Sequence, residues 1–293
     1  MKQCMECLNS YDSSIKRCPN CGYEPVLIDG FYAYAPELAR TAPGFKPAYF
    51  LELASLEEDS FWFQARRRLI LFALKRFIPA FDSFMEIGCG TGYILSEVYK
   101  AFPHTIPKGS EIYIEGLSFA KTRLPTADLL QMDARRIPFK EEVDVIGAFD
   151  VLEHIHEDEL VLRQTHQALK SGGLLLITVP QHRWLWSRVD ENACHVRRYS
   201  KGELHEKLAN AGFRVLRSTS FISLLLPAMW LSRTLNKLKK NNPGSGGSEL
   251  SAISPILNSI FKKILSVESF LIFKGVDFSM GGSRFVVAKK IDL

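Results

Sequence analysis

One glycine-rich stretch, Met85-Glu-Ile-Gly-Cys-Gly-Thr-Gly-Tyr93, constrains the fold of this chain more than any other feature. Apolar and aromatic residues precede it and predict a buried strand. An apolar pattern of helical spacing (Ile94, Leu95, Val98) follows it. Glycines tolerate positive φ and let a ligand approach the backbone closely. A strand, a glycine-rich turn and a helix in this order are typical of nucleotide-binding α/β folds.

The spacing of the glycines distinguishes two kinds of ligand. A dinucleotide-binding turn has the pattern G-x-G-x-x-G and places a pyrophosphate at the helix N-terminus. Here the pattern is G-x-G-x-G, Tyr93 stands where the third glycine would be, and Glu86 comes two residues before Gly88. A carboxylate at that position would repel a pyrophosphate, whereas it could hold an ammonium group. S-adenosylmethionine carries an ammonium and a sulfonium and has no phosphate.

The turn resembles the first motif of the class I S-adenosylmethionine-dependent methyltransferases, acid-x-G-x-G-x-G. Two later stretches are also similar to that family: Asp150-Val-Leu-Glu-His-Ile155, and the D-x4-H-x-R-x-Y pattern from Asp190 to Tyr199. The resemblance implies an α/β fold, with a Rossmann-like sheet of seven mostly parallel strands and helices on both faces. An ordinary glycine-rich turn in another α/β protein is the alternative.

The resemblance also implies where the cofactor would bind. Glu86 and the glycines would hold the methionine part, and Asp133 would accept the adenine amino group. Glu111 lies 19 residues beyond Gly92, and an acid about 20 residues beyond such a turn is placed to bind ribose hydroxyls. The predicted cofactor-binding residues are Arg66, Glu86, Gly88, Cys89, Gly90, Thr91, Gly92, Glu111, Ile112, Asp133, Ala134, Asp150, Val151 and Leu152.

Two histidines are candidates for acid–base catalysis. His195, oriented by Asp190, is the first candidate for a general base, because a neutral histidine near pH 7 can deprotonate a hydroxyl. Family analogy places His154 at the substrate mouth as the second candidate. The alternative is that His195 only anchors its loop. Arg197 and Arg198 could pair with an acidic group of the substrate.

Four cysteines near the N-terminus form two C-x2-C pairs, Cys4 with Cys7 and Cys18 with Cys21, separated by ten residues. Two such pairs can present four thiolates to one tetrahedral zinc ion. A redox role is the alternative, which two pairs in close succession disfavour. Because so short a segment has little core of its own, the zinc would be structural. Few basic residues accompany the cysteines, so bracing the domain or contacting a protein is favoured over binding nucleic acid.

The sequence as a whole predicts five segments. These are a zinc-ribbon-like segment (1–26), an irregular linker with an N-terminal helical cap (27–79), the cofactor-binding core (80–220), a helical insert (221–282) and the final strand (283–293). The insert begins with the apolar run Phe221–Leu231, and Asn241–Ser248 reads as a flexible loop. The insert could be a substrate lid, line a lipid-accepting pocket, or make a peripheral membrane contact through 221–240.

Composition narrows the partners and the compartment. The formal net charge of +5 permits an acidic substrate or a membrane surface but does not require nucleic acid. No apolar run reaches the roughly 18 residues that span a bilayer. No signal peptide is recognisable, and six cysteines in this context suggest a reducing compartment. We therefore expect a cytoplasmic protein, with contact at the membrane surface as an option. The oligomeric state is not predicted.

These features together predict methyl transfer from S-adenosylmethionine to an oxygen or nitrogen of a small-molecule, saccharide or lipid-linked acceptor. No N/D-P-P-Y/F or Pro-Cys pair stands after the fourth strand, which disfavours nucleobase methylation. Two other classes are weighed against this prediction. One is a module that binds protein or RNA through the zinc ribbon, with the methyltransferase fold only binding cofactor. The other is a dinucleotide oxidoreductase, which Tyr93 and Glu86 disfavour.

Overall fold

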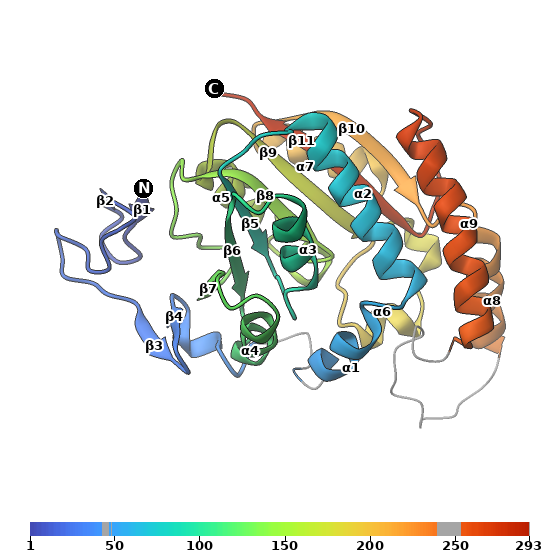
Figure 1. Ribbon diagram of the computed structural model, residues 1–293, viewed down its shortest axis with the longest axis horizontal. Helices are drawn as coiled ribbons and strands as arrows, with labels where there is room; N and C mark the ends of the chain where they lie inside the picture. Colours follow the sequence, from blue (N-terminus) through green and yellow to red (C-terminus); the bar gives the residue numbers. More distant parts are fainter. Residues whose placement is uncertain (43–46, 48, 239–252, 293) are drawn as a thin grey trace.

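The computed structural model describes residues 1–42, 47, 49–238 and 253–292, and the predicted flexible loop 241–248 lies outside this range (Figure 1). Its main element is a nine-stranded sheet with the order β10-β11-β9-β8-β5-β6-β7-β4-β3. The strands are β3 (Val26–Ile28), β4 (Phe31–Ala33), β5 (Ser83–Ile87), β6 (Ile106–Glu111), β7 (Asp128–Gln131), β8 (Val143–Phe149), β9 (Leu169–Pro180), β10 (Phe213–Phe221) and β11 (Ser283–Lys290).

The predicted seven-stranded, mostly parallel sheet corresponds to β5–β11. Strands β7, β6, β5, β8 and β9 are parallel neighbours. Strand β11 runs antiparallel to both β9 and β10. All parallel strands therefore present their carboxyl ends at one edge, which is where ligands bind in such sheets.

Two further strands lie largely in the segment that we interpreted as an irregular linker, and that interpretation is wrong for residues 27–33. Strand β4 joins the sheet beside β7, and β3 pairs with β4 as a hairpin. The hairpin turns at Asp29 and Gly30, whose φ angles are 50° and 88°. Positive φ at both central residues defines the type I′ turn that Asp-Gly favours. The Asp-Gly pair is thus a hairpin signal that the surrounding prolines and aromatic residues obscured.

Helices cover both faces of the sheet in the described part of the chain (Figure 1). Residues of α2, α3, α4 and α9 pack in one apolar core, and residues of α5 and α7 pack in the other. Successive strand residues alternate between the cores, as pleated strands require. Phe84 and Val145 face the first core, and Met85 and Ile146 face the second. The bounds are α1 (Tyr49–Leu56), α2 (Phe61–Phe77), α3 (Tyr93–Ala101), α4 (Ile114–Arg123), α5 (Asp158–Ala168), α6 (Arg188–Asn192), α7 (Lys201–Asn210), α8 (Leu226–Leu238) and α9 (Pro255–Phe273), with 3-10 turns η1 (Pro36–Leu38), η2 (Leu152–His154) and η3 (Arg183–Leu185).

The predicted N-terminal helical cap contains two helices, because the chain breaks after Leu56 and Ser60 then caps α2. Residues 170–173 belong to β9, which begins at Leu169 directly after α5. The two glycines there lie in a strand whose register shifts against β8.

The cysteine segment and the helical insert lie at opposite ends of the sheet (Figure 1). The cysteine segment, with its short strands β1 (Lys2–Gln3) and β2 (Ser10–Tyr11), is tied to the core through the loop after β7. Gln3 N donates to Pro138 O at 3.0 Å, and Lys140 N donates to Met1 O at 2.9 Å. At the other end, α9 packs beside α2. Among the described helices, none combines the length and apolar character that a membrane crossing requires.

Candidate active site

A cavity of about 1610 Å³ opens at the carboxyl edge of the parallel strands. The predicted acids Glu86, Glu111, Asp133 and Asp150 all line it, as does much of the glycine-rich turn. The topology explains this, because each acid lies at or just beyond the end of a parallel strand. The structure therefore brings together residues that are far apart in the sequence, since Glu86 and Asp150 are separated by 64 positions.

The turn after β5 depends on its glycines at two positions in particular. Gly88 has φ +65°, and a Cβ there would lie 2.6 Å from a methyl of Val151. Gly92 has φ +74° and caps α3, and a Cβ there would lie 2.9 Å from Ala120 Cα. A side chain at either position would be strained by its backbone angle and would also collide with a neighbour. The turn thus passes closely between β8 and α4.

Glu86 has a buried carboxylate without a complete set of partners. Its relative exposure is 3%, and no hydrogen bond reaches its Oε2 from the described residues. Burial raises the pKa of Glu86 to about 8, which the nearby Arg66 only partly counteracts. A buried carboxylate in this state favours a cationic partner. This is the chemistry that an amino group in the cavity would satisfy.

Glu111 shapes the glycine-rich turn as well as facing the cavity. Its carboxylate accepts hydrogen bonds from the backbone N–H groups of Gly90 at 3.0 Å, Ile112 at 2.8 Å and Tyr113 at 3.4 Å. Burial raises its pKa, and these three hydrogen bonds oppose that shift. Oε1 accepts two of these hydrogen bonds and Oε2 accepts one, so Oε2 keeps a lone pair for a hydroxyl group.

The other two predicted acids are already engaged by arginines. Asp133 forms an ion pair with Arg135, whose Nη2 lies 2.8 Å from Oδ2. Asp150 pairs with Arg66 at 2.5 Å and accepts a hydrogen bond from Thr178 at 2.8 Å. The Arg66 guanidinium also lies over the Trp62 ring, 4.5 Å from its centroid. Helix α2 thus closes one side of the cavity through a cation–π contact and an ion pair.

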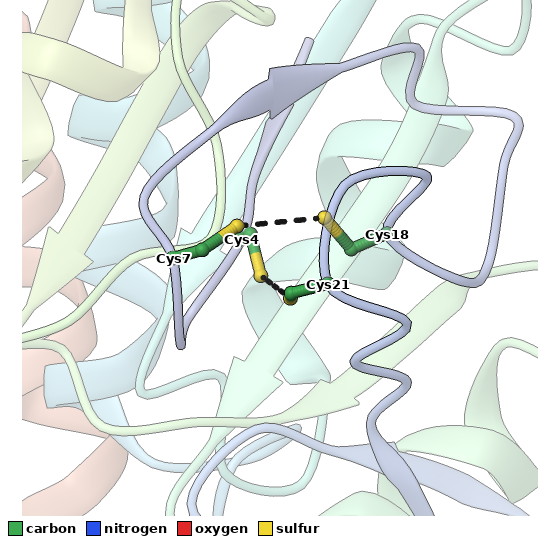
Figure 2. Close-up of side chains that lie close together, drawn as sticks. All are labelled: Cys4, Cys7, Cys18 and Cys21. Carbon is green, nitrogen blue, oxygen red and sulfur yellow. Dashed lines mark hydrogen bonds between the residues drawn. The ribbon is translucent and has the colours of Figure 1, made fainter.

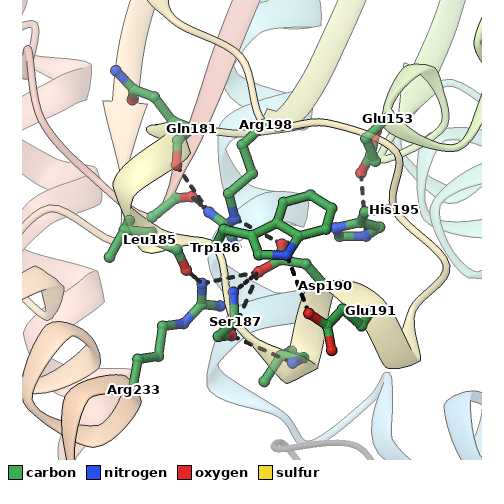
Figure 3. A network of polar contacts seen from close by, with 12 residues as sticks. Glu153, Gln181, Leu185, Trp186, Ser187, Asp190, Glu191, His195, Arg198 and Arg233 are labelled. Carbon is green, nitrogen blue, oxygen red and sulfur yellow. Dashed lines mark hydrogen bonds and ion pairs between the residues drawn. The ribbon is translucent and has the colours of Figure 1, made fainter. Parts of the chain in front are cut away.

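Asp190 is the centre of a buried polar network in the wall of the cavity (Figure 3). Its Oδ1 lies 3.0 Å from His195 Nδ1 and 2.7 Å from Arg198 Nε, and its Oδ2 accepts from Ser187 N at 3.0 Å. Burial alone would raise the pKa of Asp190, but the hydrogen bond to His195 and the two arginines, Arg198 and Arg233, hold it below its ordinary value. The predicted pairing of Asp190 with His195 is therefore present.

The predicted availability of Arg197 and Arg198 for a substrate is not what the structure shows. Arg198 is buried and pairs with Asp190, and its Nη1 donates to Gln181 O at 2.8 Å. Arg197 donates to His156 O and pairs with Asp158. Both guanidiniums hold the loop that carries His195, so their role in the described structure is positioning.

Glu153 and His154 lie directly against His195. The ring centroids of His154 and His195 are 4.9 Å apart, and His195 Nε2 is 3.9 Å from Glu153 Oε1. Burial raises the pKa of Glu153 well above its ordinary value. Burial, followed by the charge of His195, lowers the pKa of His154 to about 4. His154 is consequently neutral at pH 7 and is a weak base, which makes His195 the better candidate of the two.

Sequence reasoning missed Glu57, Arg123 and Glu153. Glu57 follows α1, is 5% exposed and contacts Thr91 of the glycine-rich turn. No local sequence pattern links Glu57 to a turn 34 positions away. Glu153 stands inside the Asp-Val-Leu-Glu-His run, and its position there was a signal that we did not use.

The four N-terminal cysteines converge as predicted (Figure 2). Cys4 Sγ is 3.5 Å from Cys21 Sγ, and Cys7 Sγ is 3.7 Å from Cys18 Sγ. All four sulfurs lie within 4.8 Å of one another, so they could hold a metal ion. Thiolates at about 2.3 Å from a tetrahedral zinc are roughly 3.8 Å apart, which these separations approach.

The sheet order, the glycine-rich turn and the acids at successive strand ends define the α/β class of S-adenosylmethionine-dependent methyltransferases. The sequence model of the methyltransferase domain family matches residues 59–218, and the chain belongs to this family.

Known relatives agree with this assignment. A "probable S-adenosylmethionine-dependent methyltransferase" of Mycolicibacterium smegmatis is 26% identical over 166 residues, covering 56% of this chain and 63% of the relative. A trans-aconitate 2-methyltransferase of an Azoarcus species is 26% identical over 127 residues, covering 43% and 48%. The chain thus spans less than two thirds of these relatives. A chain from the complex of the Haloferax volcanii Trm112 methyltransferase activator with a methyltransferase shares the fold, with a TM-score of 0.55, 15% identity and coverage of 84% and 96%.

Proposed function

We propose that the protein transfers the methyl group of S-adenosylmethionine to an oxygen or nitrogen of an acceptor. The buried Glu86 carboxylate beside the glycine-rich turn is the observation that supports this most, since its unpartnered oxygen suits the ammonium of the cofactor. Glu111 would bind the ribose hydroxyls, and Asp133 would accept the adenine amino group in place of one of the contacts that both of its oxygens now make with Arg135. The cofactor supplies a methyl on a positively charged sulfur.

Glu86 and Glu111 are placed for binding, whereas Arg66 and Trp62 would close the methionine side of the cavity. In the transfer, a lone pair of the acceptor forms a bond to the methyl carbon while the carbon–sulfur bond breaks. The electron pair remains on sulfur, and S-adenosylhomocysteine leaves. An enzyme promotes such a displacement mainly by holding the two reactants in line. If the acceptor is a hydroxyl, its proton must also leave, and His195 Nε2 faces the cavity for this purpose because Nδ1 is bonded to Asp190.

The acceptor has an apolar part in our proposal, as in a lipid-linked substrate. The helical insert supplies a set of apolar side chains to the same cavity: Ile222, Leu225, Met229, Leu257 and Phe261. Apolar walls bind apolar surface by removing it from water. The cavity is also larger than the 300–1,000 Å³ that is typical of small-ligand sites, so it has room for a cofactor and a second molecule. A saccharide or another small molecule is the polar alternative.

The same insert provides a surface for peripheral membrane contact. On α9, Ile256, Ile260, Val267 and Phe270 are exposed, with Lys263 on the same helical stripe. Spacings of three and four residues place these side chains on one face. An apolar helix face with lysines suits the interface of an anionic membrane. Sedimentation with anionic vesicles tests this: Ile260→Glu should reduce binding, whereas a matched change at an exposed isoleucine outside α9, Ile106→Glu at the start of β6, should not.

Calorimetric titration of the full chain with S-adenosylhomocysteine, and separately with NAD, tests the proposed cofactor. We expect micromolar binding of S-adenosylhomocysteine and none of NAD. Glu111→Ala should abolish binding, while Glu115→Ala, at the neighbouring acid on α4, should leave it within about twofold. Binding of NAD alone would move the protein to the oxidoreductases. Failure of both ligands to bind a folded protein would refute the cofactor assignment.

We further propose that the cysteine cluster holds one structural zinc ion. The four converging sulfurs support this, and the segment has only a small core, formed by Cys4, Tyr11 and Cys18. A metal assay on the purified chain tests it, with zinc expected and lost in Cys18→Ser.

A further inference from the structure

We propose that Glu153, His154 and His195 form a second metal site, which binds a divalent transition-metal ion on the acceptor side of the cavity. One carboxylate oxygen and one imidazole nitrogen from each histidine lie within 4.8 Å of one another. A metal bound at about 2.1 Å separates its ligands by roughly 3 to 4 Å. Small side-chain rotations would therefore bring the three ligand atoms to binding distance.

Several of the candidate ligand atoms are buried and lack a hydrogen-bond partner within the described structure, which supports a bound metal ion. Glu153 is 0% exposed, and neither of its carboxylate oxygens has a hydrogen-bond partner among the described residues. His154 Nδ1 is likewise buried without a partner in this part of the chain. Buried polar groups are nearly always satisfied, and an orphaned group in a native fold requires an explanation such as an unseen ion. Here three groups with metal-binding chemistry face one another, and two of them have unpartnered atoms.

The surroundings have the arrangement that metal-binding histidines require. Asp190 bonds to His195 Nδ1 at 3.0 Å, which fixes the ring and leaves Nε2 directed at Glu153. A carboxylate behind a ligating histidine orients the ring and raises its basicity. The nearest arginines do not occupy the site. Arg198 pairs with Asp190 and Arg66 pairs with Asp150, and neither makes an ion pair with Glu153 in the described structure.

The ligand set indicates the kind of metal and what it would bind. Two imidazoles with one carboxylate suit zinc, manganese, iron or cobalt rather than calcium or magnesium. Three protein ligands leave at least one coordination position open, as in catalytic metal sites. Glu153, His154 and His195 all line the cavity, so the open position would face the acceptor. An oxygen of a hydroxyl or carboxylate acceptor is the natural fourth ligand.

The use of the metal in activating an acceptor rests on the proposed function. Metal binding itself does not depend on methyl transfer. With metal bound, His195 is a ligand, and the metal takes over the activation of an acceptor hydroxyl that we assigned to the histidine as a base. The two roles are therefore mutually exclusive at His195 and can be separated by experiment.

The test uses the full-length protein loaded with cobalt, because thiolate-bound cobalt absorbs intensely in the near ultraviolet whereas cobalt bound by nitrogen and oxygen does not. We expect two cobalt ions per chain. One should give the thiolate band, and the other should give only weak visible bands. Glu153→Gln and His195→Gln should each lose the second ion and keep the thiolate band. Cys18→Ser should do the reverse, and His104→Gln, an exposed histidine, should change neither.

Each possible outcome decides the proposal. A single cobalt ion in the unaltered protein, or a second ion that persists in the Glu153→Gln, His195→Gln double variant, would overturn it. Circular dichroism checks that each variant is folded, and titration with S-adenosylhomocysteine measures cofactor binding separately. Two metal ions without cofactor binding would leave the metal site standing and refute the methyl-transfer proposal, and cofactor binding with only the thiolate-bound ion would do the opposite.

Discussion

The hydroxyl of Thr91, in the glycine-rich turn, hydrogen-bonds to the carboxylate of Glu57 at 2.6 Å, although the two residues are 34 positions apart. Arg123 of α4 completes the contact, with its Nη1 2.7 Å from Glu57 Oε2 and 2.8 Å from the Thr91 hydroxyl. The network is largely buried. It links the segment between α1 and α2, the proposed cofactor turn and α4, so the order of the turn depends on the helical cap in front of it.

Breaking this network should destabilise the fold. Arg123→Met leaves the Glu57 carboxylate buried without its cation, and the loss of one member of a buried ion pair costs about 3 kcal/mol. We expect the free energy of unfolding in urea to fall by about that amount. Arg163→Met, in an exposed pair with Glu159, should change it by less than about 0.5 kcal/mol. If the two substitutions lowered the free energy of unfolding equally, the buried pair would contribute no more to stability than the exposed pair does.

Gly92 should tolerate alanine much less well than Gly202, a glycine within a helix. In Gly92→Ala the methyl would meet Ala120 Cα at 2.9 Å and would stand on a residue with φ +74°. We expect a loss of about 1 to 3 kcal/mol in stability and weaker binding of S-adenosylhomocysteine. At Gly202, in α7, a Cβ meets nothing within 4 Å, so Gly202→Ala should be neutral or stabilise by up to about 1 kcal/mol. Tolerance of alanine at position 92 would contradict the strained turn that we describe.

Much of the sheet could be predicted from the sequence, because buried parallel strands are short apolar runs and each ends in a recognisable polar residue. The strand before the glycine turn and the acids Glu111, Asp133 and Asp150 illustrate this. Strands β3 and β4 were missed because three residues in each carry too little periodicity to be distinguished from a loop. Only the Asp29-Gly30 pair marked them.

The residues of the site likewise divide into those that the sequence could predict and those that it could not. Residues on the local motif, such as Glu86 and His195, could be named from the sequence. Residues that act across the fold could not, because Glu57, Arg123 and Arg233 reach their partners through packing of separate helices. Arg198 shows the reverse error. Its position beside His195 suggested a free cation, whereas the fold buries it against Asp190.

Cofactor binding should depend on pH through Glu86. Burial raises its pKa to about 8, so the ligand-free protein carries a proton there at neutral pH. The ammonium of the cofactor favours the carboxylate, so binding below pH 8 must release that proton. The affinity for S-adenosylhomocysteine should therefore rise by up to about tenfold per pH unit between pH 6 and pH 8. Calorimetry in buffers of different ionisation enthalpy would detect the released proton.

Glu86→Gln is the control for this dependence. The variant should bind S-adenosylhomocysteine more weakly at pH 8 and with an affinity that is nearly flat between pH 6 and pH 8. The stability of the ligand-free protein provides a second readout. A carboxyl whose folded pKa lies above its unfolded value contributes stability that is present below about pH 4.5 and is lost as the pH rises through about 8. The unaltered protein should lose this contribution, and Glu86→Gln should not. Identical pH profiles for the two proteins would exclude Glu86 as the ammonium site.

Removing the proposed zinc should loosen one defined part of the surface and leave the cofactor site in place. The cysteine segment holds the loop after β7 through the bonds of Gln3 to Pro138 and Lys140 to Met1, and Arg136 donates to Met5 O at 2.7 Å. Without metal the segment loses most of its folding energy, so these bonds should open. We expect Cys18→Ser to increase amide hydrogen exchange over residues 1–26 and 136–140.

The affinity of Cys18→Ser for S-adenosylhomocysteine should change by less than about threefold, because Glu86 and Glu111 make no contact with the segment in the described structure. Cys194→Ser, at a cysteine outside the cluster, should keep both the zinc and the exchange protection. If Cys18→Ser abolished cofactor binding while the protein stayed folded, the cysteine cluster would support the active site and not merely brace the edge of the sheet.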